Sequence, residues 1–145
     1  MKVSNCMTRE VQLADPNMTL RDAAQIMARC DAGALPVGEN DRLVGMLTDR
    51  DIAIRGVAEG KGPGATVREA MSRDVCWCYE DEEVEDALHR MADEQIRRMP
   101  VLSRAKRLVG IISMADLTES AHPRQTGEAL SAISRESNQH NQILH

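Results

Sequence analysis

Two short segments of the chain each combine a hydroxyl side chain with an aspartate three residues later. They are Thr48 with Asp51, and Ser113 with Asp116. In each segment an apolar, strand-like stretch ends at the hydroxyl residue and a short helix follows. The hydroxyl and the unpaired backbone N–H groups at the positive end of that helix can bind phosphate. The aspartate can accept hydrogen bonds from both hydroxyl groups of a ribose. The same spacing is also that of a helix cap that needs no ligand, so the residues alone leave both interpretations open.

The elements that position these segments occur twice, because the chain repeats itself. A shift of 64 residues aligns the first copy with the second, and one extra residue in the loop at 103–107 changes the shift to 65. The aligned pairs include Val3 and Val67, Met7 and Met71, Val11 and Val75, Asp22 and Asp86, Met27 and Met91, Pro36 and Pro100, Gly45 and Gly110, and Asp51 and Asp116. Two copies therefore cover most of the chain.

Each copy contains one helix with an apolar stripe at helical spacing. The stripes are Leu20, Ala23, Ala24 and Met27 in the first copy, and Val84, Ala87, Leu88 and Met91 in the second. Thr19 and Asp22 form a capping-box pattern that predicts where the first helix begins. Short apolar strands follow at 35–37 and 43–48, and again at 99–101 and 108–113, and the copies close with short helices at 51–55 and 116–120.

The fold class that we expect is α/β (α+β), with two pseudo-symmetric repeats of strand, helix, strand, strand and helix. The first repeat spans residues 1–58, a glycine-rich linker spans 59–66, and the second repeat spans 67–120. A half of about 60 residues buries too little surface to be stable alone, so we expect the halves to pack as an intramolecular pair. Residues 121–145 are a polar C-terminal tail, partly disordered, in which Ala129, Leu130 and Ile133 predict one face of a helix around 124–135.

The composition of the chain argues against several classes of function. The net charge of −5 and the single Trp, single Tyr and absence of Phe argue against nucleic acid as a partner. The longest apolar stretches have five residues, which predicts no membrane span, and the first ten residues lack the apolar core of a secretory signal. We therefore expect a cytoplasmic protein. No catalytic motif occurs, and we expect no enzyme activity.

Four cysteines, at positions 6, 30, 76 and 78, show no disulfide rhythm and are expected to be reduced thiols. Cys76 and Cys78 could bind zinc together with histidines of the tail at positions 122, 140 and 145. The Cys-x-Cys spacing argues against this because a closed site needs two more ligands nearby. The alternative is that both cysteines are small buried hydrophobic residues.

The repeated order of a helix, an x-Pro-Val strand and the motif Leu-Val-Gly, two apolar residues, Thr or Ser, and Asp three residues later resembles a tandem pair of CBS domains, a Bateman module. The resemblance covers residues 1 to about 120 and implies a stand-alone regulatory protein. It also implies two clefts for adenosine-containing ligands such as AMP, ADP, ATP, NAD or S-adenosylmethionine, with the aspartate holding the ribose.

The resemblance also implies roles for particular residues. Arg98 stands two residues before Pro100, where CBS repeats often carry an arginine that reaches ligand phosphates. One site is therefore expected to comprise Arg98, Ser113, Asp116 and Val11, and the other Thr48, Asp51 and Cys76. The first repeat has Gly33 and Ala34 where the second has Arg97 and Arg98, and Arg50 or Arg55 could substitute there. An alternative for Arg97 and Arg98 is an exposed pair that answers the acidic run 80–86.

Two functions of different classes follow. The first is an adenine-nucleotide-sensing regulatory module that acts on an unidentified partner protein. The second is a purely structural dimerisation module with no physiological ligand. In either case the resemblance implies a homodimer, in which another subunit buries helix faces carrying Ile52, Ile54 and Val57, or Leu117.

Overall fold

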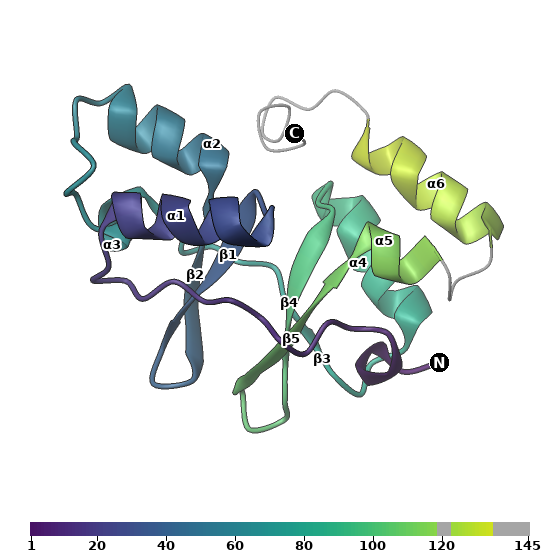
Figure 1. The fold of residues 1–145 in the computed structure, drawn as a ribbon. Helices are drawn as coiled ribbons and strands as arrows, with labels where there is room; N and C mark the ends of the chain where they lie inside the picture. Colours follow the sequence, from purple (N-terminus) through teal and green to yellow (C-terminus); the bar gives the residue numbers. More distant parts are fainter. Residues whose placement is uncertain (119–122, 135–145) are drawn as a thin grey trace. The chain divides into compact units, whose positions relative to one another are not determined.

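The computed structural model of the chain (Figure 1) describes residues 1–118 and 123–134. It divides into two compact units. Residues 12–75 form one unit, which we call the first-repeat unit. Residues 1–11 together with the chain from residue 76 onward form the other, which we call the second-repeat unit. No helix in the described part of the chain is long and apolar enough to span a membrane.

The first-repeat unit is a β-hairpin with helices. Its elements are α1 (Leu20–Cys30), β1 (Ala34–Glu39), β2 (Arg42–Thr48), α2 (Asp49–Asp51), the π-helix η2 (Ile52–Val57) and α3 (Val67–Ala70). Strands β1 and β2 pair antiparallel, with a register shift between Val37 and Gly38. Its core consists mainly of aliphatic side chains from α1, both strands and α3.

The second-repeat unit has the same antiparallel hairpin and adds a third strand and a further helix. In the first-repeat unit, the strand expected before α1 is reduced to a single bridge between Ala14 and Val37, so the predicted order of strand, helix, strand, strand and helix is incomplete there. Its elements are the 3-10 helix η1 (Val3–Asn5), β3 (Cys78–Tyr79), α4 (Val84–Glu94), β4 (Arg98–Leu102), β5 (Leu108–Ser113), α5 (Met114–Thr118) and α6 (Pro123–Ile133). The sheet order is β3-β4-β5; β3 is parallel to β4, and β4 is antiparallel to β5. A register shift between Val101 and Leu102 matches that of the other hairpin.

The two long helices form where their apolar stripes predict them. The Asp22 N–H donates to Thr19 Oγ1 at 3.1 Å, which confirms the predicted start of α1. Both helices end on a left-handed residue, Asp31 at φ 51° and Gln95 at φ 55°. One stripe residue was assigned wrongly: Ala24 is exposed, because the buried face of α1 turns to Ile26 instead.

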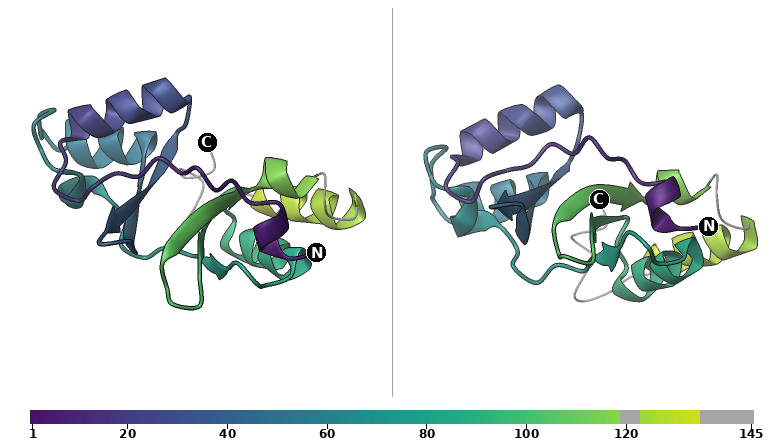
Figure 2. Two further views of the ribbon diagram at one scale, coloured as in Figure 1. Left: turned by 60° about the horizontal axis from the view of Figure 1, so that its bottom comes forward. Right: turned by 90° about the horizontal axis from the view of Figure 1, so that it is seen from below.

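Each unit is completed by the segment that begins the other repeat. The Val3 and Ser4 N–H groups donate to the carbonyls of Glu82 and Glu80 in the turn before α4, and Thr8 pairs antiparallel with Ile111 of β5. Figure 2 shows η1 beside this part of the second-repeat unit in two views. The segment at 65–72 does the same for the first-repeat unit, where Ser72 pairs with Met46 of β2. The spatial units therefore do not coincide with the linear repeats 1–58 and 67–120, which remain a description of the sequence.

Two glycines permit this exchange. A Cβ atom on Gly45 would lie 2.7 Å from the Ser72 carbonyl oxygen, and a Cβ atom on Gly110 would lie 2.8 Å from that of Thr8. Real Cβ atoms do not approach so closely, so any larger residue would force the crossing segment away from the strand. The glycine of each Leu-Val-Gly motif is thus the point at which the segment that begins the other repeat crosses the strand.

The C-terminal helix α6 belongs to the second-repeat unit. Its Ala129 and Ile133 are buried in the core of that unit, and the Gln95 side-chain amide donates to the Ala132 carbonyl at 3.1 Å. The helix confirms the apolar face predicted from Ala129 and Ile133, although Leu130 is 37% exposed. The predicted disorder of the final residues concerns positions outside those that the structure describes.

Candidate functional site

The two Thr/Ser-x-x-Asp segments form the same structure. The Asp51 N–H donates to Thr48 Oγ1 at 3.0 Å, and the Thr48 N–H donates to Asp51 Oδ2 at 2.9 Å. The Asp116 N–H donates to Ser113 Oγ at 3.3 Å, and the Ser113 N–H donates to Asp116 Oδ2 at 3.0 Å. Both are reciprocal capping boxes. Because they begin the helices, α2 and α5 start two residues earlier than predicted, at Asp49 and Met114.

Capping leaves acceptor positions on Asp51. Its Oδ2 accepts one backbone N–H, whereas an ionised carboxylate has about four acceptor positions on two oxygens. In the second box Asp116 Oδ2 accepts the Ser113 N–H in the same way. The cap holds the aspartate at the end of its strand and fixes its orientation. The two interpretations of Thr48–Asp51 and Ser113–Asp116 are therefore compatible, because a cap of this kind also presents an oriented acceptor.

The hairpin register places the residue opposite each box. Ala34 pairs with Thr48, and Arg98 pairs with Ser113. The residue before each of these accepts a further backbone hydrogen bond: Gly33 O from the Asp49 N–H and Arg97 O from the Met114 N–H, both at 2.9 Å. The structure thus matches Gly33 with Arg97, Ala34 with Arg98, and Asp49 with Met114. We call the first member of each pair, together with the Thr48–Asp51 box, the Thr48 site. The second members, together with the Ser113–Asp116 box, are the Ser113 site.

Arg98 is exposed at the Ser113 site. Its guanidinium group makes no hydrogen bond or ion pair with any residue in the described part of the chain. Arg97 and Arg98 are both exposed, as the alternative to a phosphate role expects, but neither forms an ion pair with the acidic run 80–86 in the described part of the chain. Three acids of that run have other partners. They are Arg90 on Glu82 at 2.6 Å, Arg104 on Asp81 at 2.9 Å, and Lys2 on Glu83 at 2.8 Å. A cation without a protein partner beside a capped helix start is suited to an anion.

The Thr48 site has a different set of charges. Arg55, one of two possible substitutes for the missing arginine, donates to the carbonyls of Ala70 and Met71 and so holds the end of α3. Arg50 is half-buried. Asp49, which sequence reasoning passed over, is exposed, and its Oδ1 accepts the Arg50 N–H at 2.8 Å. The signal that could have revealed it was a charged residue directly after the strand, where the other repeat has methionine.

Val11 and Cys76 lie where the chain passes from one unit to the other. Val11 is half-buried at the end of the N-terminal segment, in the same unit as Arg98, Ser113 and Asp116. Cys76 belongs to the second-repeat unit, whereas Thr48 and Asp51 belong to the first-repeat unit. The structure therefore brings the first predicted set into one unit and leaves the second set divided.

Burial favours the protonated form of the thiols at positions 76 and 78. Cys76 packs against the core with its Sγ 3.6 Å from the Met99 sulfur, and burial raises its pKa. Cys78 is fully buried, and burial raises the pKa of its thiol to about 12. Among residues 1–118 and 123–134 no three His, Cys, Asp or Glu side chains are placed to hold a metal ion. The histidines of the zinc alternative lie outside these residues.

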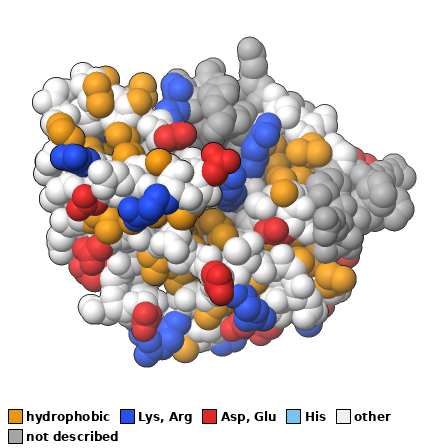
Figure 3. All heavy atoms as spheres, viewed as in Figure 1, with side chains coloured by type: hydrophobic (Ala, Val, Ile, Leu, Met, Phe, Trp, Pro, Cys, Tyr) orange, Lys and Arg blue, Asp and Glu red, His pale blue; other side chains and the backbone are white. Residues whose placement is uncertain are grey.

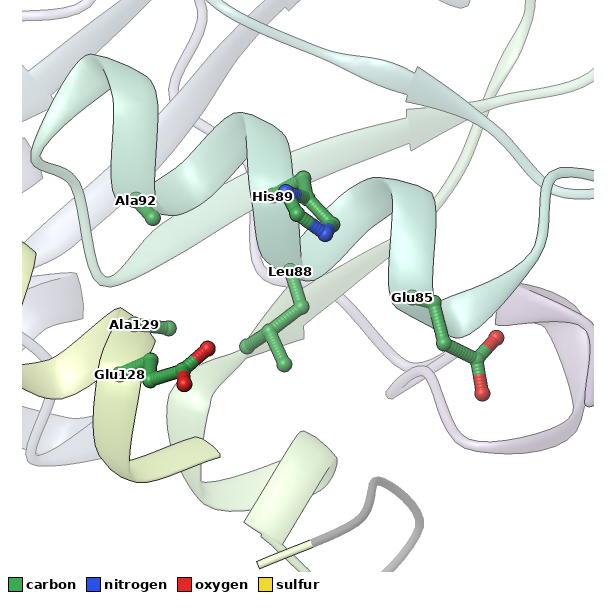
Figure 4. Close-up of a pocket in the computed structure, with 6 residues that line it drawn as sticks. All are labelled: Glu85, Leu88, His89, Ala92, Glu128 and Ala129. Carbon is green, nitrogen blue, oxygen red and sulfur yellow. The ribbon is translucent and has the colours of Figure 1, made fainter. Parts of the chain in front are cut away.

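A small hollow of about 90 Å³ lies between α4 and α6. Figure 4 shows its lining, which comprises Glu85, Leu88, His89 and Ala92 from α4 and Glu128 and Ala129 from α6. Its volume is well below the 300 Å³ or more that is typical of a small-molecule site. The hollow is a seam between two packed helices, and its lining includes no residue of either capped site.

Comparison with known proteins agrees with this architecture. A family model described as CBS domain matches residues 3–56 and again residues 67–122. The CBS domain-containing protein YhcV of Bacillus subtilis is 39% identical over 135 residues, which cover 92% of this chain and 96% of YhcV. Hypoxic response protein 1 of Mycobacterium tuberculosis is 45% identical over 101 residues, which cover 68% of this chain and 70% of that protein.

Solved structures share the fold. A crystal structure of Hypoxic Response Protein I with two coordinated zinc ions has a TM-score of 0.77 and 39% identity, and covers 84% of this chain and 100% of that one. The CBS domain pair of protein MJ0100, in complex with 5′-methylthioadenosine and S-adenosyl-L-methionine, has a TM-score of 0.72 and 29% identity, and covers 82% of this chain and 94% of that one. With two matching domains over nearly its whole length, this chain belongs to the CBS-domain family as a tandem pair.

Proposed function

We propose that this CBS pair is a regulatory module that binds an adenosine-containing ligand and has no enzymatic activity of its own. The observation that carries the proposal is Arg98, an exposed guanidinium group opposite the Ser113–Asp116 capping box. Support comes from the CBS pair of MJ0100, which holds two adenosyl ligands. The partner protein that such a module regulates has no signature in this chain.

The proposed roles follow from the chemistry of the groups. Asp116, held by its cap at the end of β5, accepts the ribose hydroxyls. Arg98 donates to phosphate oxygens through its planar fork. Ser113 Oγ accepts the Asp116 N–H and the Met114 N–H donates to the Arg97 carbonyl, so Ser113 acts by holding Asp116 in place. Val11 contributes an apolar contact to the base, and Cys76 does the same for the Thr48 site.

A ligand panel tests the proposal directly. Thermal unfolding is measured with AMP, ADP, ATP, NAD, S-adenosylmethionine and 5′-methylthioadenosine. A ligand present at 100 times its Kd stabilises the folded state by about 2.7 kcal/mol, which raises Tm by several degrees. No stabilisation by any member at millimolar concentration contradicts ligand sensing and favours the structural module.

Arg98→Ala tests the assignment of the phosphate contact. A charge-assisted hydrogen bond contributes about 1.5–3 kcal/mol, so Kd for AMP or ATP is expected to rise ten- to a hundredfold in calorimetric titration. Binding of adenosine is expected to be unchanged. Arg97→Ala is the matched control, since it removes an equal charge from the adjacent position. Equal losses in both variants would reduce the role of Arg98 to general electrostatic attraction.

One observation favours the second candidate function, a structural dimerisation module. Ile54 and Val57 of η2 are 51% and 70% exposed, and hydrophobic side chains gather over this helix in Figure 3. We propose that a second copy covers them in a homodimer. Leu117, the other candidate, is wrong as a contact because the core of its own unit buries it completely, and Ile52 packs against the core of the first-repeat unit. Light scattering at tens of micromolar is expected to give a dimer that Val57→Asp dissociates; a monomeric parent contradicts it.

A further inference from the structure

The two capped sites carry opposite charge. At the Ser113 site the charged residues are Arg97, Arg98 and Asp116, which leave one net positive charge. At the Thr48 site they are Asp49, Arg50 and Asp51, which leave one net negative charge. The backbone equivalence set by the hairpin register makes this a comparison of matched positions and not of loosely similar loops.

Asp49 occupies the space that the missing side chain of Gly33 leaves. A Cβ atom on Gly33 would lie 3.1 Å from Asp49 Oδ2 and 3.5 Å from Oδ1. The carboxylate therefore lies against the backbone of the residue that corresponds to Arg97. Its hydrogen bond from the Arg50 N–H holds it there. In the second-repeat unit the counterpart of Asp49 is Met114, which is 6% exposed and belongs to the core.

The cations near the Thr48 site do not occupy the position of Arg98. Arg55 keeps its charge, but its guanidinium donates to the carbonyls of Ala70 and Met71 and is held at the end of α3. Arg50 lies between two aspartates in the sequence, so its charge is more than matched. Ala34 has no donor at the position where Arg98 stands in the other hairpin. A phosphate group entering here would find Ala34 at the position of Arg98, and the Asp49 carboxylate against the neighbouring Gly33.

We infer that the Thr48 site takes an adenosine derivative without a phosphate, with a neutral or cationic 5′ substituent, whereas the Ser113 site takes phosphorylated ligands. The inference rests on the proposed function, that the capped sites bind adenosyl ligands. The Asp51 carboxylate accepts the ribose in the same way as Asp116, so the nucleoside part is common to both sites. The presence of Arg98 at one site, and of Ala34 with the Asp49 carboxylate at the other, decides which 5′ group is accepted.

Calorimetric titration of an Asp116→Ala variant isolates the Thr48 site, after circular dichroism has shown that the variant is folded. The probes are 5′-methylthioadenosine, S-adenosylmethionine and AMP. The first two are expected to bind at least tenfold more tightly than AMP, and comparing them separates neutral from cationic preference. AMP binding as tightly as 5′-methylthioadenosine, or no binding at this site at all, would overturn the inference.

Two substitutions test the residues that carry the inference. Ala34→Arg restores the missing guanidinium and is expected to strengthen AMP binding ten- to a hundredfold in the Asp116→Ala background. Asp49→Asn keeps the acceptor for the Arg50 N–H and is expected to strengthen AMP binding severalfold. Glu59→Gln is the matched control, because it removes one exposed negative charge elsewhere in the same unit. An unchanged ratio of the two Kd values in both test variants contradicts the inference.

A competition in the parent protein provides a route that needs no variant. If the two sites have different ligands, saturation with AMP leaves 5′-methylthioadenosine binding at a stoichiometry of one per chain. If the sites are alike, AMP displaces 5′-methylthioadenosine, and the inference is wrong while the proposed function stands. If neither ligand binds the parent, the proposed function itself fails.

Discussion

The Thr48 and Ser113 sites have the same backbone arrangement and differ in the side chains beside their capping boxes. Both have a reciprocal capping box, the same hairpin register and the same backbone hydrogen bond from the first helical residue. Only the residues that the backbone leaves unconstrained differ, with Arg98 opposite one box and Ala34 opposite the other. The duplicated frame fixes where a ligand group would lie, and the unconstrained positions decide its charge.

The units also differ in how their helices are covered. Helix α6 buries Ala129 and Ile133 against the second-repeat unit, and residues 12–75 include no corresponding helix. In the first-repeat unit Ile54 and Val57 remain exposed. The second-repeat unit therefore buries an additional helix of its own chain, while the first-repeat unit leaves two apolar side chains of η2 exposed.

Removing the contribution of α6 should affect only the second-repeat unit. Ile133→Ala empties a fully buried position and is expected to lower the free energy of unfolding by about 2–5 kcal/mol. Urea denaturation followed by circular dichroism measures the loss. Leu130→Ala is the control on the same helix, because Leu130 is partly exposed and its loss is expected to be much smaller. Equal losses would mean that α6 does not belong to the core.

The glycines of the two Leu-Val-Gly motifs should respond alike. Gly45→Ala and Gly110→Ala each place a methyl group against a crossing backbone, and each is expected to cost about 1–3 kcal/mol of stability. Thermal denaturation measures both. Gly64→Ala, with nothing within 4 Å of the new methyl group, should cost nothing comparable. If only one of the two motif variants is destabilised, the crossings are not equivalent.

The two capping boxes should contribute similar amounts to the free energy of unfolding. Thr48→Ala and Ser113→Ala each remove the side-chain acceptor for one backbone N–H, at an expected cost of about 0.5–2 kcal/mol. Chemical denaturation measures the two losses. Ser131→Ala, at an exposed position inside α6, serves as the control and should change stability by less than about 0.5 kcal/mol. A loss at one box only would show that the other hydroxyl serves a ligand and not the fold.

The smallest expected difference between the two repeats is in how stability depends on pH above about 9. Buried Cys78 has its pKa raised to about 12, whereas its counterpart in the other repeat is Ala14, which does not titrate. The unfolded thiol ionises near pH 9 while the folded thiol stays protonated, so its stabilising contribution is complete below pH 9 and is lost as pH rises toward 12. Unfolding at pH 8, 9 and 10 should therefore show a steeper loss in the parent than in Cys78→Val. Cys30→Ala should follow the parent, because Cys30 is exposed.

Periodicity predicted the regular parts of the fold well. The helix stripes, the paired strands and the start of α1 follow from local rules that act within a few residues, and they lie where expected. The start of α2 was wrong by two residues because the capping function of Thr48 was weighed only as an alternative. Ala24 was assigned to the core because an alanine fits either face of a helix.

The exchange of segments lay beyond local sequence. Val3 and Met7 read as ordinary apolar residues, and nothing in their spacing says which unit they complete. Gly45 and Gly110 likewise read as strand residues until the crossing segments are seen. At the sites, the sequence identified both aspartates and Arg98, but Asp49 acquires meaning only through its position against Gly33. Whether Val11 and Cys76 contact a ligand stays a prediction.

The exchanged N-terminal segment sets an order for folding during synthesis. Residues 12–75 form a contiguous unit, whose partners have all been made once residue 75 leaves the ribosome. Residues 1–11 are made before that unit, but the strand that pairs with Thr8 is not complete until more than a hundred residues later. At about 5–20 residues per second this is a delay of about 5–20 seconds. During that interval Val3 and Met7 lack their native partners, so a segment made before the first-repeat unit reaches its native place after it.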